Sequence, residues 1–122
     1  MHRTGKREKR KAGSLGEQLA AAYLEKKGFE ILEYNYRCRQ GEIDLIAREK
    51  EYLVFIEVKA RRTKASGYPA EAVDLRKQQK ICRTAQFYCL EHRIHTDCPI
   101  RFDVIEILGD KVRWIGNAFD FC

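Results

Sequence analysis

Hydrophobic and polar positions along the chain repeat with two different periods, which separate predicted helices from predicted strands. The capping-box sequence Ser14-Leu15-Gly16-Glu17 opens the first segment with a helical period, and Gly28 is a typical stop. The second helical segment starts at Pro69, a residue suited to a first turn, and ends near Glu91. The predicted elements are helices over residues 15–27 and 69–91 and strands over residues 30–37, 42–48, 52–59, 101–107 and 111–115.

The order of these elements is typical of an α/β domain. A chain with the order α-β-β-β-α-β-β is expected to form a mixed β-sheet flanked by helices. The sequence Gly109-Asp110 predicts a two-residue hairpin turn between the last two strands. With 122 residues the chain is long enough for one domain, which we assign to residues 13–122.

The first twelve residues differ in composition from the rest of the chain. Six of them are lysine or arginine and one is glutamate, so this segment supplies most of the net charge of +6. We assign residues 1–12 to a basic arm without hydrophobic periodicity, which can follow the phosphates of a nucleic acid. A solvated tail without a partner explains the same charge as well.

Composition argues against several other classes of protein. The longest uninterrupted apolar run, Leu19–Leu24, is six residues long and too short to cross a bilayer. No charged-then-apolar leader opens the chain, so no secretory signal is expected. The five cysteines are odd in number and lack CxxC spacing, which argues against a disulfide framework and a zinc knuckle. We therefore expect a cytoplasmic protein with reduced thiols and no membrane partner.

Two neighbouring strands are predicted to carry an acidic pair on one face. If the hairpin formed by these strands turns about Lys50-Glu51, the two residue numbers of each directly opposed pair add up to 101. Asp44 then lies opposite Glu57, and Glu42 lies opposite Lys59. The apolar residues expected to share the other, buried face are Ile43, Leu45, Ala47, Val54, Ile56 and Val58.

Two directly opposed carboxylates favour the binding of a cation. Their Cβ atoms would lie roughly 5 Å apart, where like charges destabilise the pair. Magnesium takes oxygen ligands and needs only one or two carboxylates. It polarises a phosphate oxygen and lowers the pKa of a bound water, while Lys59 on the same face can offset charge on the phosphate. The alternative is an exposed strand face with a Glu42–Lys59 ion pair, but Ile46, Leu53 and Phe55 on that face indicate that it is covered.

Two further acids have structural explanations. Glu17 occupies the last position of the capping box, which accounts for it without any chemistry. It also shares a helix face with Ala20, Ala21 and Leu24, so it could reach inward as a third carboxylate. Asp103 lies in an otherwise apolar strand, and we expect it to be a structural acid that accepts hydrogen bonds.

The order of these residues resembles a known nuclease pattern. Glu17 on a helix, Asp44 on a strand and Glu57-Val58-Lys59 on the next strand are similar to the PD-(D/E)xK motif of restriction-type nucleases, and archaeal Holliday junction resolvases share this order. Ile43 stands where the name of the motif has proline. The whole chain resembles the bacterial YraN-like family over about residues 14–119. The segments that carry this resemblance are residues 41–46, 54–62, 77–80 and 101–104.

The resemblance implies a restriction endonuclease-like core with a metal-dependent site. It implies that Asp44, Glu57 and the carbonyl of Val58 hold Mg²⁺, or Mn²⁺ in its place. It also implies that Lys59 is catalytic and that Glu17 helps to bind the metal or a water molecule.

Basic residues flank the predicted site. Arg61 and Arg62 follow it directly in sequence, and positive charge beside a metal site suits a phosphate backbone. The second predicted helix carries a basic stripe, for which a solvated helix face is the commoner explanation. The resemblance is what favours Lys77 and Lys80 as phosphate contacts.

The leading hypothesis is an endonuclease that hydrolyses phosphodiester bonds in nucleic acid, with DNA as the expected partner. Branched DNA and a homodimer are implied by the resolvase resemblance alone. One alternative is a nuclease fold that binds nucleic acid or a protein without cutting. Another is a cytoplasmic interaction domain whose acidic cluster is structural.

Overall fold

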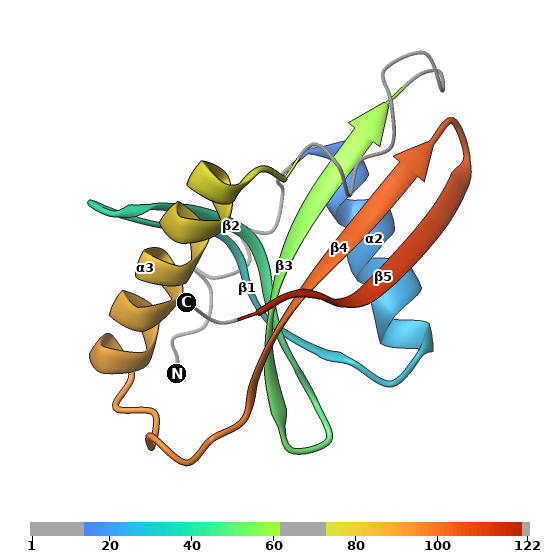
Figure 1. Cartoon of the computed structure of the whole chain (residues 1–122). Helices are drawn as coiled ribbons and strands as arrows, with labels where there is room; N and C mark the ends of the chain where they lie inside the picture. Colours follow the sequence, from blue (N-terminus) through green and yellow to red (C-terminus); the bar gives the residue numbers. More distant parts are fainter. Residues whose placement is uncertain (1–13, 62–72, 121–122) are drawn as a thin grey trace.

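A computed structural model of the chain describes residues 14–61 and 73–120 (Figure 1). The predicted basic arm, Arg62 and the predicted helix start at Pro69 lie outside these residues, and of Arg61 the backbone alone is described. The elements in chain order are α2 (Leu15–Lys26), β1 (Glu30–Cys38), β2 (Gly41–Glu49), β3 (Tyr52–Arg61), α3 (Leu75–Glu91), β4 (Ile100–Leu108) and β5 (Lys111–Phe119).

The strands form one mixed sheet, as the sequence predicted. Their spatial order is β1-β2-β3-β4-β5. Strand β3 pairs with β4 in parallel, and the other neighbouring pairs are antiparallel. The parallel connection contains α3, while α2 packs on the opposite face of the sheet (Figure 1). The fold is therefore a three-layer α/β arrangement. Within the described residues, neither helix is long and apolar enough to cross a membrane.

Side-chain caps set the starts of both helices. Ser14 caps α2, and the reciprocal bonds between Ser14 and Glu17 form the predicted capping box. Asp74 caps α3 by accepting a bond from the backbone N–H of Lys77 at 2.9 Å. The prediction that Val73 and Asp74 are helical was wrong, because the extended backbone of Asp74 places its carboxylate over the first turn.

The register of β2 and β3 follows the predicted sum of 101. Observed pairs include Leu45 with Ile56, Ile46 with Phe55, and Arg48 with Leu53. The hairpin turn contains Lys50, whose φ of 55° belongs to the left-handed region.

The prediction that Ile43 shares a face with Leu45 was wrong. Leu45 joins the apolar cluster under α2, whereas Ile43 joins the cluster under α3. The paired strand β1 changes face at the same level, because Tyr34 packs with the α2 cluster and Tyr36 with the α3 cluster. Between them Asn35 takes a φ of 53°, which breaks the alternation of the extended backbone. Asp44 lies opposite this break.

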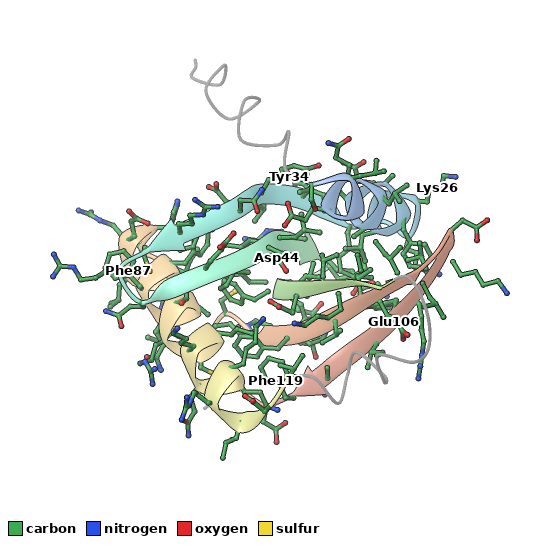
Figure 2. The ribbon with its side chains drawn as sticks, turned by 90° about the horizontal axis from the view of Figure 1, so that it is seen from above. Lys26, Tyr34, Asp44, Phe87, Glu106 and Phe119 are labelled. Atoms are coloured by element: carbon green, nitrogen blue, oxygen red, sulfur yellow. The ribbon has the colours of Figure 1, made fainter. Side chains whose placement is uncertain are left out.

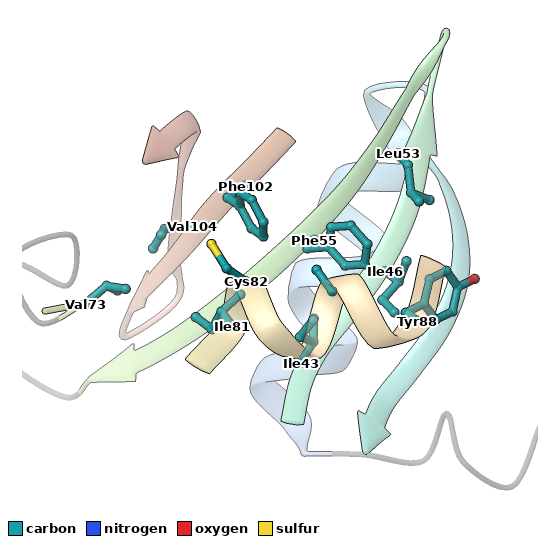
Figure 3. Close-up of a cluster of buried hydrophobic side chains, with 11 residues drawn as sticks. Ile43, Ile46, Leu53, Phe55, Val73, Ile81, Cys82, Tyr88, Phe102 and Val104 are labelled. Atoms are coloured by element: carbon teal, nitrogen blue, oxygen red, sulfur yellow. The ribbon is translucent and has the colours of Figure 1, made fainter. Parts of the chain in front are cut away.

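Apolar side chains form one core on each face of the sheet. A fully buried leucine, isoleucine or phenylalanine contributes roughly 1.5–3 kcal/mol. The α3 cluster (Figure 3) contains Ile43, Ile46, Leu53, Phe55, Val73, Ile81, Cys82, Ala85, Tyr88, Phe102 and Val104. The α2 cluster contains Ala20, Ala21, Leu24, Phe29, Leu45, Ala47, Val54, Ile56, Ile105 and Ile107.

Asp103 has the structural role predicted for it. Its side chain is 0% exposed and accepts two bonds from Arg101, at 2.9 Å each. It also accepts the indole N–H of Trp114 and the backbone N–H of Asn117, both at 2.8 Å. These bonds satisfy the buried charge and tie β4 to β5. Strand β5 runs to Phe119, beyond the predicted end at residue 115, with a register shift against β4 and a φ of 52° at Asn117.

Candidate metal and nucleic-acid site

The sheet divides where the predicted acidic pair lies. The ladder between β2 and β3 ends at Leu45 and Ile56. Beyond this pair β2 stays paired with β1, and β3 stays paired with β4 as far as Arg61. Asp44 and Glu57 are the next residues on the two strands, so both carboxylates lie at the opening. Figure 2 shows Asp44 on β2 beside β3.

The carboxylate of Asp44 is bonded to the backbone of β3. A continued ladder would pair Val58 with Ile43, but the N–H of Val58 instead donates to Oδ2 of Asp44 at 2.8 Å. This bond fixes the orientation of the carboxylate across the opening. Asp44 thus closes the split with its side chain and remains close to Glu57.

The pKa of Asp44 is raised from its ordinary 3.8 to about 7. Burial is the largest cause, followed by the negative charge of Glu57, while the Val58 N–H acts in the opposite direction. Glu17 and Glu42 add smaller upward contributions to this pKa. The ionised form of Asp44 is therefore costly unless a cation balances it.

Glu57 lies between two lysines. It is 7% exposed, and its Oε2 lies 2.7 Å from Nζ of Lys77 and 3.6 Å from Nζ of Lys59. Burial and the neighbouring Lys77 ammonium lower the pKa of Lys59, against the upward effect of Glu57. Burial also acts to lower the pKa of Lys77, but its bond to Glu57 outweighs this effect and the pKa is raised. Asp44, Glu57, Lys59 and Lys77 thus form one charged cluster.

The expected pairing of Glu42 with Lys59 is absent from this cluster. Glu42 instead approaches Arg37, with 3.5 Å between Oε2 and Nε. The cause is the division of the sheet, which carries Glu42 away with β1 and β2. The alternative of an exposed Glu42–Lys59 face is therefore wrong.

Glu17 has the capping role that the sequence left open. Its Oε1 accepts the backbone N–H of Ser14 at 3.1 Å, and its own N–H donates to Oγ of Ser14. Its charge nevertheless reaches Asp44, whose pKa it raises. The structure thus places Glu17 near the carboxylate pair while its side chain completes the cap. Its catalytic role stays a prediction.

Two hollows border the acidic pair. A cavity of about 200 Å³ is lined by Gly41, Glu42, Asp44, Glu57, Lys77, Lys80 and Ile81, so predicted phosphate contacts lie on its α3 side. An open cleft of about 870 Å³ is lined by Ser14, Glu17, Glu33, Asn35, Tyr36, Arg37, Glu42, Glu91 and His92. The small cavity therefore has a basic wall, whereas the large cleft is mainly acidic.

Sequence reasoning missed one buried acid near the site. Glu106, labelled in Figure 2, lies on β4 and is 7% exposed. In the parallel register of β3 and β4 it is the partner of Lys59. Its Oε1 accepts a bond from Arg113 at 3.3 Å. The available signal was an acid within an otherwise apolar strand, the same signal that identified Asp103.

The donor atoms at the opening fit a magnesium or manganese ion. The two carboxylates supply hard oxygen donors, the kind that these cations prefer. Within residues 14–61 and 73–120, no group of three or more histidine, cysteine, aspartate or glutamate side chains is arranged to hold a metal. An ion here would rely on Asp44 and Glu57, and magnesium commonly completes such a set with water.

The fold and this cluster define a three-layer α/β protein with a carboxylate pair at a split in its sheet. The chain belongs to the UPF0102 family: the model described as "Uncharacterised protein family UPF0102" matches residues 16–107. A UPF0102 protein of Lachnoclostridium phytofermentans is 48% identical over 112 residues, which cover 92% of this chain and 95% of the relative. One from Acetivibrio thermocellus is 51% identical over 124 residues, with 93% and 95% covered. These matches confirm the predicted YraN-like family.

Proposed function

We propose that this chain is a metal-dependent endonuclease that hydrolyses phosphodiester bonds in nucleic acid. The observation that supports this proposal is the carboxylate pair Asp44–Glu57, held together at the split of the sheet with Lys59 beside it. Two acids in this position destabilise the fold, as the raised pKa of Asp44 indicates. Such an arrangement is typical of a site that binds a cation.

Each residue of the cluster has a role in this reaction. Asp44 and Glu57, with the carbonyl of Val58, would hold the magnesium ion. The bound ion supplies Lewis-acid activation of the phosphate and a more acidic water. Lys59, whose pKa is lowered by burial and by Lys77, orients the attacking water or stabilises the charge that develops on the phosphate. Glu17 contributes negative potential at Asp44 from the start of α2.

The charge around the site favours one direction of approach for the substrate. The large cleft on the Glu17 side contains Glu33, Glu42 and Glu91, which repel phosphates. The backbone of a nucleic acid would therefore run along the α3 side, past Lys80. Arg61 and Arg62 extend this basic path in the sequence.

The nature of the substrate rests on the resemblance to archaeal Holliday junction resolvases. This resemblance favours branched DNA and a homodimer. A cytoplasmic location is supported by Cys38, Cys89 and Cys98, which are free thiols in the described part of the chain.

A binding module that does not cut is the second candidate. It is favoured by the ammonium groups of Lys59 and Lys77 on Glu57, since they balance this buried carboxylate without a metal. Such a module would bind nucleic acid in the presence of a chelator and would leave every substrate intact.

Cleavage of a substrate panel separates the two candidates. Four-way junction, flap, single strand, duplex and RNA would be incubated with magnesium or manganese, using wild type, Glu57→Gln and Lys59→Met. The exposed Glu51→Gln and Lys111→Met serve as charge-matched controls. We expect the site variants to lose roughly 10²–10³-fold in cleavage rate while they retain binding, and the controls to cut like wild type. Equal binding by all proteins with no cleavage by wild type would exclude a nuclease for this panel.

A further inference from the structure

Lys77 is anchored at its backbone, and its long side chain is partly exposed. Its N–H is held by Asp74 at the start of α3, whereas its side chain is 41% exposed. The Glu57 side chain is 8% exposed and extends from the central strand β3. The 2.7 Å ion pair thus joins a movable ammonium to a fixed carboxylate. Lys59 contacts the same Oε2 atom from 3.6 Å, with 21% of its side chain exposed.

We propose that Lys77 is a built-in counter-ion that competes with the divalent metal for Glu57, and that its ammonium moves to the phosphate backbone of the nucleic acid when the metal binds. This inference rests on the proposed nuclease function and assigns Lys77 two alternating contacts.

Competition follows from the chemistry of one carboxylate oxygen. Oε2 of Glu57 already accepts the Lys77 ammonium at the distance of a strong charged hydrogen bond. A divalent cation held by Asp44 and Glu57 would balance the negative charge of the same carboxylate and repel the ammonium. Lys77 is the partner that yields, because its side chain is about half exposed and has a long flexible stem.

A released Lys77 would lie beside Lys80, the proposed phosphate contact on α3. Lys80 is three residues further along α3, so the two side chains are neighbours on the helix surface. Both line the 200 Å³ cavity beside Asp44. Within the part of the chain that the structure describes, Lys80 makes no ion pair with Glu57, so it is already available for phosphate. Metal binding would therefore raise the positive charge presented along this side of α3 from one lysine to two.

The two binding events are linked by this exchange. If the metal frees an ammonium for the phosphate, the metal strengthens nucleic-acid binding, and nucleic acid strengthens metal binding by the same factor. The contact between Lys77 and Glu57 also neutralises Glu57 whenever the metal is absent. The site then stays folded but binds nucleic acid weakly.

Calorimetric titration of Mn²⁺ into the metal-free full chain tests the competition. We expect Lys77→Met to bind the ion roughly 5–10-fold more tightly than wild type, because a partly exposed ion pair is lost. The matched variant Lys80→Met removes the same charge from the same cavity and should change the affinity less than about 2-fold. Lys77→Arg keeps the charge and should bind manganese like wild type, which would assign the effect of Lys77→Met to the lost charge.

Nucleic-acid binding provides the second measurement. With uncleavable phosphorothioate DNA, manganese should strengthen binding by wild type roughly 5–10-fold, and this gain should disappear in Lys77→Met but persist in Lys80→Met. Equal manganese affinities for Lys77→Met and Lys80→Met, or weaker binding by Lys77→Met, would refute the competition and leave the nuclease proposal intact. If no variant binds manganese through Glu57, as judged by Glu57→Gln, both proposals fail together.

Discussion

Replacement of Asp44 by asparagine tests whether the acidic pair strains the fold. The side chain can still accept the Val58 N–H, so the bond across the split is kept while the charge is removed. In wild type the pKa of Asp44 is raised to about 7 by burial and by Glu57. A carboxyl group with a raised pKa stabilises the folded state below its unfolded pKa, and this contribution is lost as pH rises through the folded pKa.

The magnitude follows from the difference between the two pKa values. A folded pKa of about 7 against 3.8 in the unfolded chain corresponds to ~2.6 kcal/mol between about pH 5 and about pH 8. Because part of the shift at Asp44 comes from the charge of Glu57, a change at Asp44 alone is expected to recover only part of this energy. We therefore expect the free energy of unfolding of wild type to fall by about 1–3 kcal/mol more than that of Asp44→Asn over this range.

Urea denaturation of both proteins in the presence of a chelator measures this difference. The exposed Asp110→Asn in the β4–β5 turn removes the same charge and should follow wild type at every pH. At about pH 8 Asp44→Asn should be the more stable protein. Parallel stability curves for wild type and Asp44→Asn would show that Asp44 ionises without cost and would refute the reasoning about the strained pair.

Three further predictions concern parts of the fold that hold the site in place. Asp103→Asn should lower the free energy of unfolding by about 3 kcal/mol in urea denaturation, because an amide nitrogen would face the donors on Arg101 and Trp114. Gly41→Ala should lower the free energy of unfolding by about 1–3 kcal/mol, because the added Cβ would lie 2.9 Å from Oγ1 of Thr84. The double variant with Thr84→Ala should recover part of this stability. Glu17→Gln keeps the capping box and should leave the melting temperature nearly unchanged. Reduced cleavage by this variant would identify a role for the charge of Glu17. Unchanged cleavage would leave helix capping as the role of this residue.

The order of the elements and the hairpins β2–β3 and β4–β5 were predictable because local patterns determine them. The apolar alternation of Leu45, Ala47, Val54 and Ile56 has one register that buries both strands, and the observed hairpin has it. The capping box at Ser14 predicted the start of α2 for the same reason. The partners in these patterns lie in one helix turn or in two strands joined by a short hairpin, so they are close in sequence.

The local geometry of the site depends on tertiary contacts, which the alternation of apolar and polar residues along a strand does not encode. The left-handed backbone at Asn35 lies at the level where Ile43 changes to the α3 side and where the pairing of β2 with β3 ends. A positive φ at a non-glycine residue has a weak sequence signal, because several residue types adopt it only in a particular tertiary setting. Strict alternation therefore placed Asp44 opposite Glu57 but did not predict the split between them.

The partners of Glu57 were also beyond prediction from the hairpin alone. Lys77 comes from a helix twenty residues away in sequence, and its position depends on how α3 crosses the sheet. The sequence identified Lys77 as a basic residue of a helix but contained no information on its distance to β3. Glu106 was missed because its neighbour relation to Lys59 arises from a parallel pairing, which leaves no periodic trace.

The interruptions in β1 and β5 affect how copies of the chain can meet. These two strands are the edges of the sheet, and each has a register shift and an asparagine with positive φ, at Asn35 and Asn117. A strand added from a second copy would find the backbone donors and acceptors out of step. Edge-to-edge growth into dimers or fibrils is therefore disfavoured. The homodimer implied by the resolvase resemblance would have to join helices or turns instead.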